Sequence, residues 1–199
     1  MTIFDLDGTL LKGNSFRWFT EYVLRHSSQR SKPQFVKLCG MLAIRKLHLC
    51  SHRRLKWHLM KVADKVLTPD DYGEFAVLMK ERVDPEMLSM LPPPEEFMVL
   101  TAASEEYVRP FVKLMGWKYF VSTMRPESGL YREYSEFRGE QKRTLLAILH
   151  IEISAVFTDH SDDIPLLAAS KGRRVLVNPS EATIRRVRSN GLYPEIIYT

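Results

Sequence analysis

Two carboxylates stand close together near the start of this chain, in the run Asp5–Leu10, whose sequence is DLDGTL. A short apolar run, Ile3 and Phe4, precedes the first carboxylate, and Gly8 follows the second, Asp7. This order predicts a buried strand that ends in a tight turn. Two acidic side chains on such a turn can hold a divalent metal ion and attack a phosphate.

Four polar residues farther along the chain complete a candidate phosphate site. Two apolar runs end in Thr101 and Asp159, and Asp163 follows the second run closely. The Thr101 hydroxyl can donate to a phosphate oxygen, and Lys142, at the start of a predicted helix, can add a positive charge. Carboxylates without a nearby thiolate favour Mg²⁺ over zinc.

The elements that must position these groups alternate between short apolar runs and helical patterns. Strands are predicted at residues 2–4, 97–100, 119–121, 155–158 and 175–177, and helices at 105–115, 141–150 and 166–170. This alternation predicts the α/β fold class, with a doubly wound parallel sheet. Ligands of such sheets bind beyond the carboxyl ends of the strands, so we expect Asp5, Thr101 and Asp159 to meet there.

The segment between the first two predicted strands is helical throughout. Apolar residues recur at helical spacing from about residue 16 to residue 90, and the proline-rich run at 91–94 cannot continue a helix. The predicted organisation is a core of residues 1–13 and 92–199 with a helical insertion at residues 14–91, called the predicted cap below.

Charge is distributed unevenly in this chain, which has a net charge of +5. Residues 15–66 hold 12 Lys and Arg but only Glu21 and Asp64, a net charge of +10, and the rest of the chain carries −5. Such a basic block is typical either of a site for an anionic partner or of an ordinary solvated helix face. Both interpretations stay open, and no recognised nucleic-acid-binding module accompanies the block.

Composition is that of a globular protein, with 199 residues, of which 45% are hydrophobic and 27% charged. No apolar run approaches the roughly 18 residues of a membrane span, and the N-terminus does not resemble a signal peptide. The only cysteines, Cys39 and Cys50, form no metal-binding pattern. We therefore expect a cytoplasmic protein without a disulfide framework.

The polar motifs together resemble those of the haloacid dehalogenase-like (HAD) hydrolase superfamily. The run Asp5–Leu10 resembles the first motif, Thr101 the second and Lys142 the third, and residues 158–167, TDHSDDIPLL, resemble the fourth. Their order matches that of the family. The predicted cap resembles the cap of the phosphoserine phosphatase-like branch, which is inserted after the first motif. The resemblance implies a Rossmann-like core.

Roles for individual residues follow from this resemblance. It implies that Asp5 is the nucleophile and that Asp7 is the general acid and base, whose backbone carbonyl also reaches the metal. The complete set is Asp5 and Asp7 for catalysis, Thr101, Ala102 and Lys142 for phosphate binding, and Asp5, Asp7, Asp159 and Asp163 for Mg²⁺.

The resemblance implies a Mg²⁺-dependent phosphatase that acts through an aspartyl-phosphate on a phosphorylated small molecule. The stretch at residues 12–15, KGNS, lacks the acidic residue expected to bind the ammonium group of phosphoserine. Bacterial lipid phosphatases that act on phosphatidylglycerophosphate also resemble this branch, so a lipid phosphate is an alternative substrate, with weak contact to an anionic membrane. The non-enzymatic alternative is binding of a nucleic acid or an anionic surface through the basic block, although no specific nucleic acid is expected.

Overall fold

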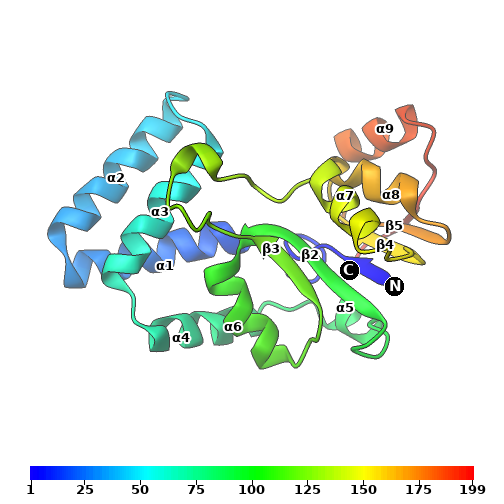
Figure 1. The fold of residues 1–199 in the computed structure, drawn as a ribbon, viewed down its shortest axis with the longest axis horizontal. Coiled ribbons are helices and arrows are strands. Elements are labelled where there is room, and N and C mark those ends of the chain that lie inside the picture. Colours follow the sequence, from blue (N-terminus) through cyan, green and yellow to red (C-terminus); the bar gives the residue numbers. More distant parts are fainter.

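The computed structural model describes residues 1–199 and contains one six-stranded parallel sheet (Figure 1). The order across the sheet is β3-β2-β1-β4-β5-β6. The strands are β1 (Thr2–Phe4), β2 (Phe97–Ser104), β3 (Phe120–Thr123), β4 (Ala155–Thr158), β5 (Arg173–Val177) and β6 (Glu195–Ile197). The α/β fold class is confirmed.

Helices connect the strands and also fill the long segment between β1 and β2. That segment contains α1 (Ser15–Arg30), α2 (Lys32–Lys46), α3 (His52–Val66), α4 (Pro69–Lys80) and α5 (Pro85–Ser89). The later helices are α6 (Glu105–Met115), α7 (Glu140–Ile148), α8 (Ile164–Ala169) and α9 (Glu181–Ser189), with 3-10 turns at Tyr131–Glu133 and Ser161–Asp163. None of the helices is both long enough and apolar enough to cross a membrane.

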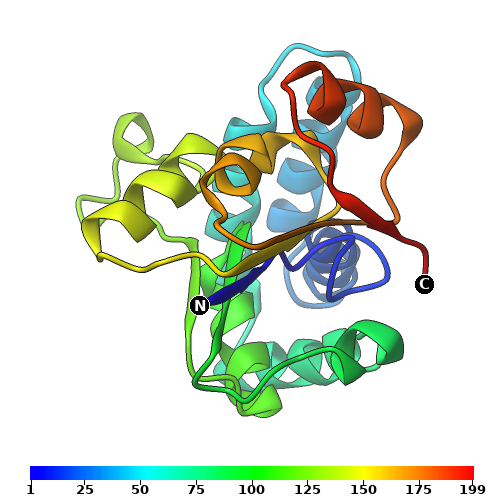
Figure 2. The same ribbon diagram turned by 90° about the vertical axis from the view of Figure 1, so that its right-hand side faces the viewer.

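The sheet is buried on both faces, because successive side chains of a strand point to opposite sides. In β1, Phe4 belongs to a large apolar cluster that includes residues of α6, whereas Ile3 belongs to a second cluster with Leu146 of α7 and Val187 of α9. Figure 2 shows the later helices (yellow to red) on one side of the sheet and the α4–α6 region (green) on the other. The core is therefore doubly wound, as predicted.

Helices α1 and α4 are joined to the core by aromatic packing. The ring of Phe19 in α1 stacks on that of Tyr107 in α6 at 4.5 Å, and Phe75 in α4 meets Phe19 edge-on at 5.0 Å. These three side chains are buried and belong to one apolar cluster. The division into residues 14–91 and the remainder stays a prediction.

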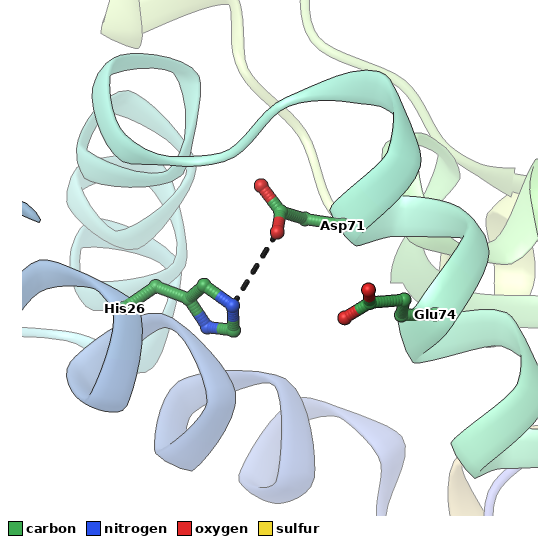
Figure 3. A group of neighbouring side chains, drawn as sticks. All are labelled: His26, Asp71 and Glu74. Carbon is green, nitrogen blue, oxygen red and sulfur yellow. Dashed lines mark ion pairs between the residues drawn. The ribbon is translucent and has the colours of Figure 1, made fainter.

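A charged cluster fastens α1 to α4 (Figure 3). Ligand atoms of His26, Asp71 and Glu74 lie within 4.8 Å of one another, and the His26 ring contacts Asp71 at 3.4 Å. Arg30 donates to both Asp71 carboxylate oxygens, at 2.5 and 2.9 Å, and its hydrogen bonds hold the pKa of Asp71 well below its usual range. Thr68 donates to the same carboxylate. Because Asp71 already has this full set of donors, the cluster is a structural anchor.

Two parts of the fold differ from the sequence prediction. The strand predicted at residues 97–100 runs on to Ser104, with an irregular register against β3, so Thr101 lies within β2. The elements α9 and β6 were not predicted. β6 has three residues, all at least partly exposed, which leaves no apolar alternation to read, although Ser180 caps α9 through the Thr183 N–H.

Candidate active site

The turn after β1 is held by backbone hydrogen bonds. The Asp5 N–H donates to the Phe157 carbonyl at 2.9 Å, which ties the end of β1 to β4. Gly8 adopts φ +73°, and its N–H donates to the Gly13 carbonyl at 2.9 Å. A Cβ at Gly8 would overlap the Asp159 carboxylate. Glycine is therefore required here both for its backbone conformation and for the approach of Asp159.

Lys142 links two of the predicted acidic residues. Its Nζ donates to Asp5 Oδ1 and to Asp163 Oδ2, both at 2.9 Å, and Thr158 Oγ1 also donates to Asp163 Oδ2. Lys142 lies in the first turn of α7, which follows Gly139 at φ +48°. Burial opposes the charge of Lys142, but Asp5 and Asp163 outweigh it, so its pKa lies above its usual range. The lysine is therefore held as a cation beside Asp5.

Asp7 is oriented by the start of the predicted cap. The backbone N–H of Ser15, the first residue of α1, donates to Asp7 Oδ1 at 2.7 Å. Burial raises the pKa of Asp7 even though the Ser15 hydrogen bond lowers it. A raised pKa favours the protonated carboxyl, which is the form that a general acid needs.

The predicted phosphate-binding residues of β2 lie beside Lys56 of α3. Thr101 Oγ1 accepts from the Ala103 N–H at 3.1 Å, which leaves the hydroxyl proton free to donate to a ligand. The Ala102 carbonyl accepts from Lys56 Nζ at 3.1 Å and from Thr123 Oγ1 at 2.8 Å.

A cavity of about 260 Å³ brings all the predicted site residues together. Its lining includes the seven predicted residues, which are Asp5, Asp7, Thr101, Ala102, Lys142, Asp159 and Asp163. The meeting of polar groups at one sheet edge is therefore observed, although the roles of these residues stay predictions.

The carboxylates of this cavity are crowded. Burial raises the pKa of Asp5 to about 6, against the opposing effect of Lys142. Burial, and next the charge of Asp5, raises the pKa of Asp159 to about 7. Asp163 Oδ1 is buried and has no hydrogen-bond partner. The cavity lining holds five aspartates against Lys56, Lys142 and Arg138, so its carboxylates outnumber the cations that face them.

These residues fit Mg²⁺. The donors are hard oxygen atoms, no cysteine lines the cavity, and the raised pKa of Asp159 reflects a charge that a cation would stabilise. The group that would hold the ion is Asp5, the Asp7 carbonyl and Asp159, with the unpartnered Asp163 Oδ1 as the fourth candidate.

We expect Asp159→Asn to stabilise the metal-free protein more at pH 8 than at pH 5. The folded carboxyl titrates near pH 7 and the unfolded one near 3.8, so the folded state holds an extra proton between these values. The protonated Asp159 carboxyl is therefore compatible with the folded state, and its contribution to stability is complete below pH 3.8. That contribution is lost as the pH rises through 7, because the folded state must then hold a buried charge. The variant should thus gain on the order of 1–3 kcal/mol between pH 5 and pH 8 relative to wild type.

Urea unfolding in EDTA measures this difference, with Asp162→Asn, a partly exposed neighbour, as the control. The comparison with wild type cancels the titration of His52, whose pKa burial lowers to about 4 and which has the opposite pH dependence. Adding Mg²⁺ should stabilise the wild type more than the variant. If Asp159→Asn raised the free energy of unfolding by the same amount at pH 5 and pH 8, Asp159 would not be a carboxylate whose charge is destabilised by burial.

Nine other residues line the cavity and were not predicted as site residues, among them Lys56, His52 and Arg138. Lys56 and His52 come from α3, and Arg138 comes from the segment before α7. The Lys56 Nζ lies 2.6 Å from Glu136, and burial lowers the pKa of Lys56. A signal for Lys56 was present in the sequence, because it falls on the buried stripe of α3, between Leu55 and Leu59, where a lysine needs a polar partner.

Comparison with known proteins gave one family match and several similar structures. The model of the family described as haloacid dehalogenase-like hydrolase matches residues 2–168. No curated protein matches significantly.

Three solved structures illustrate the likeness. A protein with unknown function from Bordetella pertussis Tohama I has 15% identity and a TM-score of 0.72, covering 99% of this chain and 97% of that one. An HAD family hydrolase from Salmonella enterica serovar Typhi has 11% identity and a TM-score of 0.63, with coverages of 98% and 66%. A probable phosphoserine phosphatase from Vibrio cholerae has 9% identity and a TM-score of 0.63, with coverages of 98% and 60%. At these identities the likeness shows the fold alone.

Proposed function

Because this chain belongs to the haloacid dehalogenase-like hydrolase family, we propose that it is a Mg²⁺-dependent phosphomonoesterase that works through an aspartyl-phosphate. The observation that carries the proposal is the placement of Lys142 Nζ at 2.9 Å from Asp5 Oδ1, in a cavity that Asp7 and Thr101 also line. A cation beside a carboxylate at the end of a parallel strand is suited to receive a phosphoryl group.

In the first step, an Asp5 carboxylate oxygen forms a bond to phosphorus as the bond from phosphorus to the ester oxygen breaks. Protonated Asp7 gives its proton to the departing oxygen, so that an alcohol leaves. Lys142 and the Thr101 hydroxyl donate to the phosphoryl oxygens, and the Lys142 contact with Asp163 keeps the lysine in place. Mg²⁺, when bound, would neutralise charge on the phosphate and on the carboxylates.

In the second step, Asp7 is a carboxylate and takes a proton from water. The water oxygen attacks phosphorus, the bond to Asp5 breaks, and inorganic phosphate leaves with Asp5 and protonated Asp7 restored. The hydrogen bond from the Ser15 N–H keeps Asp7 in one orientation through both steps.

The proposal is tested by Mg²⁺-dependent phosphate release from a panel of phosphomonoesters. In this panel, Asp7→Asn should lower steady-state turnover by about 10²–10⁴-fold, because both proton transfers are lost. With an aryl phosphate, whose leaving group needs no proton, the variant should release about one equivalent of phenol rapidly and then stall as the aspartyl-phosphate. Rapid-quench measurement of phenol detects this burst.

Asp162→Asn is the matched control, since Asp162 also lines the cavity and has no assigned proton-transfer role. It should keep wild-type turnover. Turnover of Asp7→Asn within tenfold of wild type on an alkyl phosphate would remove Asp7 from the proton-transfer role.

The cavity supports a small phosphorylated metabolite as substrate. Its volume of about 260 Å³ lies just below the roughly 300–1,000 Å³ of ligand pockets, which favours a small ligand. Lys56 and Arg138 add positive charge to its lining. Two free cysteines, of which Cys39 is exposed, are consistent with the proposed cytoplasmic location, where thiols stay reduced.

A lipid phosphate is the second candidate substrate. The observation that favours it is the basic segment at residues 15–66, whose helix α3 contributes both Lys56 to the cavity and exposed cations to the surface. The same substrate panel, extended to a phospholipid phosphomonoester in mixed micelles, distinguishes the two candidates.

A further inference from the structure

Helix α2 is unusually poorly buried for its composition. It packs against α1 and α3 and lies at the outer edge of the molecule (Figure 1). Of its 15 residues, only Leu38 is fully buried. Val36 is 67% exposed, and Leu47 and Leu49, in the turn that follows, are 67% and 73% exposed. Apolar side chains are therefore exposed to solvent in a cluster.

These exposed residues form a stripe along one side of the helix. Val36, Gly40, Ala43 and Leu47 follow one another at spacings of four, three and four, which places them on one helical face. Cys39 lies beside them at the same helical spacing. We call these five residues the α2 stripe. Every member is exposed and none is charged, the reverse of an ordinary surface helix.

Cations surround the α2 stripe and no acidic residue accompanies it. Between Glu21 and Asp64 the chain has ten Lys and Arg and no Asp or Glu. Lys37 and Lys46 are exposed on α2, and Arg54 and Lys61 are exposed on α3. The two helices bring these charges together, because Lys37, Arg54 and Lys61 all act electrostatically on the ring of His58.

We propose that the α2 stripe and its surrounding cations form a docking surface for an anionic phospholipid bilayer. Apolar side chains at such a surface enter the boundary between headgroups and acyl chains, while lysines and arginines contact the headgroup phosphates.

Charge complementarity favours a bilayer over two other possible partners, a nucleic acid and a second copy of this chain. A nucleic acid would neutralise the cations but would offer no apolar partner to Val36 and Leu47. A second copy of the chain, docked stripe to stripe, would bring Lys37 and Lys46 of both copies together with no acidic residue to oppose them. An anionic bilayer has both an apolar interior and negative headgroups, and so matches both features. This inference does not depend on the chemistry proposed above.

Vesicle cosedimentation at low salt tests the proposal. Wild type should bind vesicles of phosphatidylcholine that contain about 30–40% phosphatidylglycerol, a composition that mimics an anionic leaflet. It should not bind vesicles of pure phosphatidylcholine. The double variant Val36→Ser/Leu47→Ser should lower the partition coefficient by about tenfold or more, because two exposed apolar side chains no longer enter the bilayer. Lys37→Gln/Lys46→Gln should lower it by about tenfold or more as well.

Matched controls come from the opposite part of the fold. Ile148→Ser and Lys171→Gln change equally exposed residues outside the surface and should bind as wild type. Unfolding curves check that the stripe variants stay folded, and their turnover of a soluble aryl phosphate should be unchanged. Asp5→Asn should bind vesicles normally, so that a failure of docking and a failure of the phosphatase proposal are distinguishable.

Three results would overturn the proposal. One is absence of binding to anionic vesicles at low salt. Another is loss of binding in the lysine variant but not in the stripe variant, together with equally tight binding of duplex DNA, which would make the surface a nucleic-acid site. The third is a dimer, measured by light scattering, that Val36→Ser/Leu47→Ser dissociates.

Discussion

Asp5→Asn is expected to reduce steady-state phosphate release by at least about 10⁴-fold, the scale seen when a catalytic nucleophile is removed. An amide oxygen cannot form the aspartyl-phosphate. The fold should survive, because the amide oxygen still accepts from Lys142, which also keeps its hydrogen bond to Asp163. The metal-free variant should be at least as stable as wild type, since the charge of Asp5 raises the pKa of Asp159 and that repulsion disappears.

Phosphate release and urea unfolding, measured on the same preparation, separate loss of chemistry from loss of structure. Asp5→Ala is the second variant and should be equally inactive. Asp162→Asn should retain turnover, since the Asp162 side chain is 40% exposed and is paired with Arg138. Turnover by Asp5→Asn above about one hundredth of the wild-type rate, against the expected 10⁴-fold loss, would assign the nucleophile to another group.

Lys142→Met is expected to cost about 3–5 kcal/mol of folding free energy at pH 8 without Mg²⁺, together with phosphatase activity. The lysine is the shared cation of Asp5 and Asp163, and both it and Asp163 have side chains only 4% exposed. Its removal leaves buried carboxylates without a partner. Because the pKa of Asp5 is already raised to about 6, protonation near pH 5 should remove part of that cost.

Chemical unfolding at pH 5 and pH 8, with and without Mg²⁺, measures these effects. Arg143→Met is the matched control, because Arg143 is adjacent in α7, is exposed and pairs only with Glu140. It should change stability by less than about 0.5 kcal/mol. A cost for Lys142→Met that is the same at both pH values would show that lost packing, rather than unpaired charge, dominates.

Three residues of the candidate site, Asp5, Asp159 and Lys142, were predictable because each lies just after a strand or at a helix start that the local sequence marks. Asp5 follows the apolar β1 run, Asp159 follows β4, and Lys142 lies in the first turn of α7 after Gly139. Parallel pairing then requires the strand ends to meet, and the structure brings them to one cavity. Local signals and one topological rule were sufficient for this part.

The residues that the predicted cap contributes to the cavity could not be predicted in the same way. Lys56 reaches the Ala102 carbonyl across 46 residues of chain, and its ion pair with Glu136 spans 80. No local pattern specifies which helix face turns toward the core, because that depends on how the helices pack together. For the same reason the basic block stayed ambiguous, since only the packing of α2 shows that its apolar stripe faces solvent.

The sequence by itself determined the parallel α/β sheet and which polar residues lie where its strands end, because these follow from local periodicity, turn chemistry and the direction of strands. Only the tertiary structure decided the partners of those groups. The hydrogen bonds of Lys142 to Asp5 and Asp163 join segments that are 137 and 21 residues apart in the chain. The burial that raises the pKa of Asp159 also arises only when the chain is packed. Hydrogen bonding and desolvation depend on distance in space, and folding alone brings these segments together.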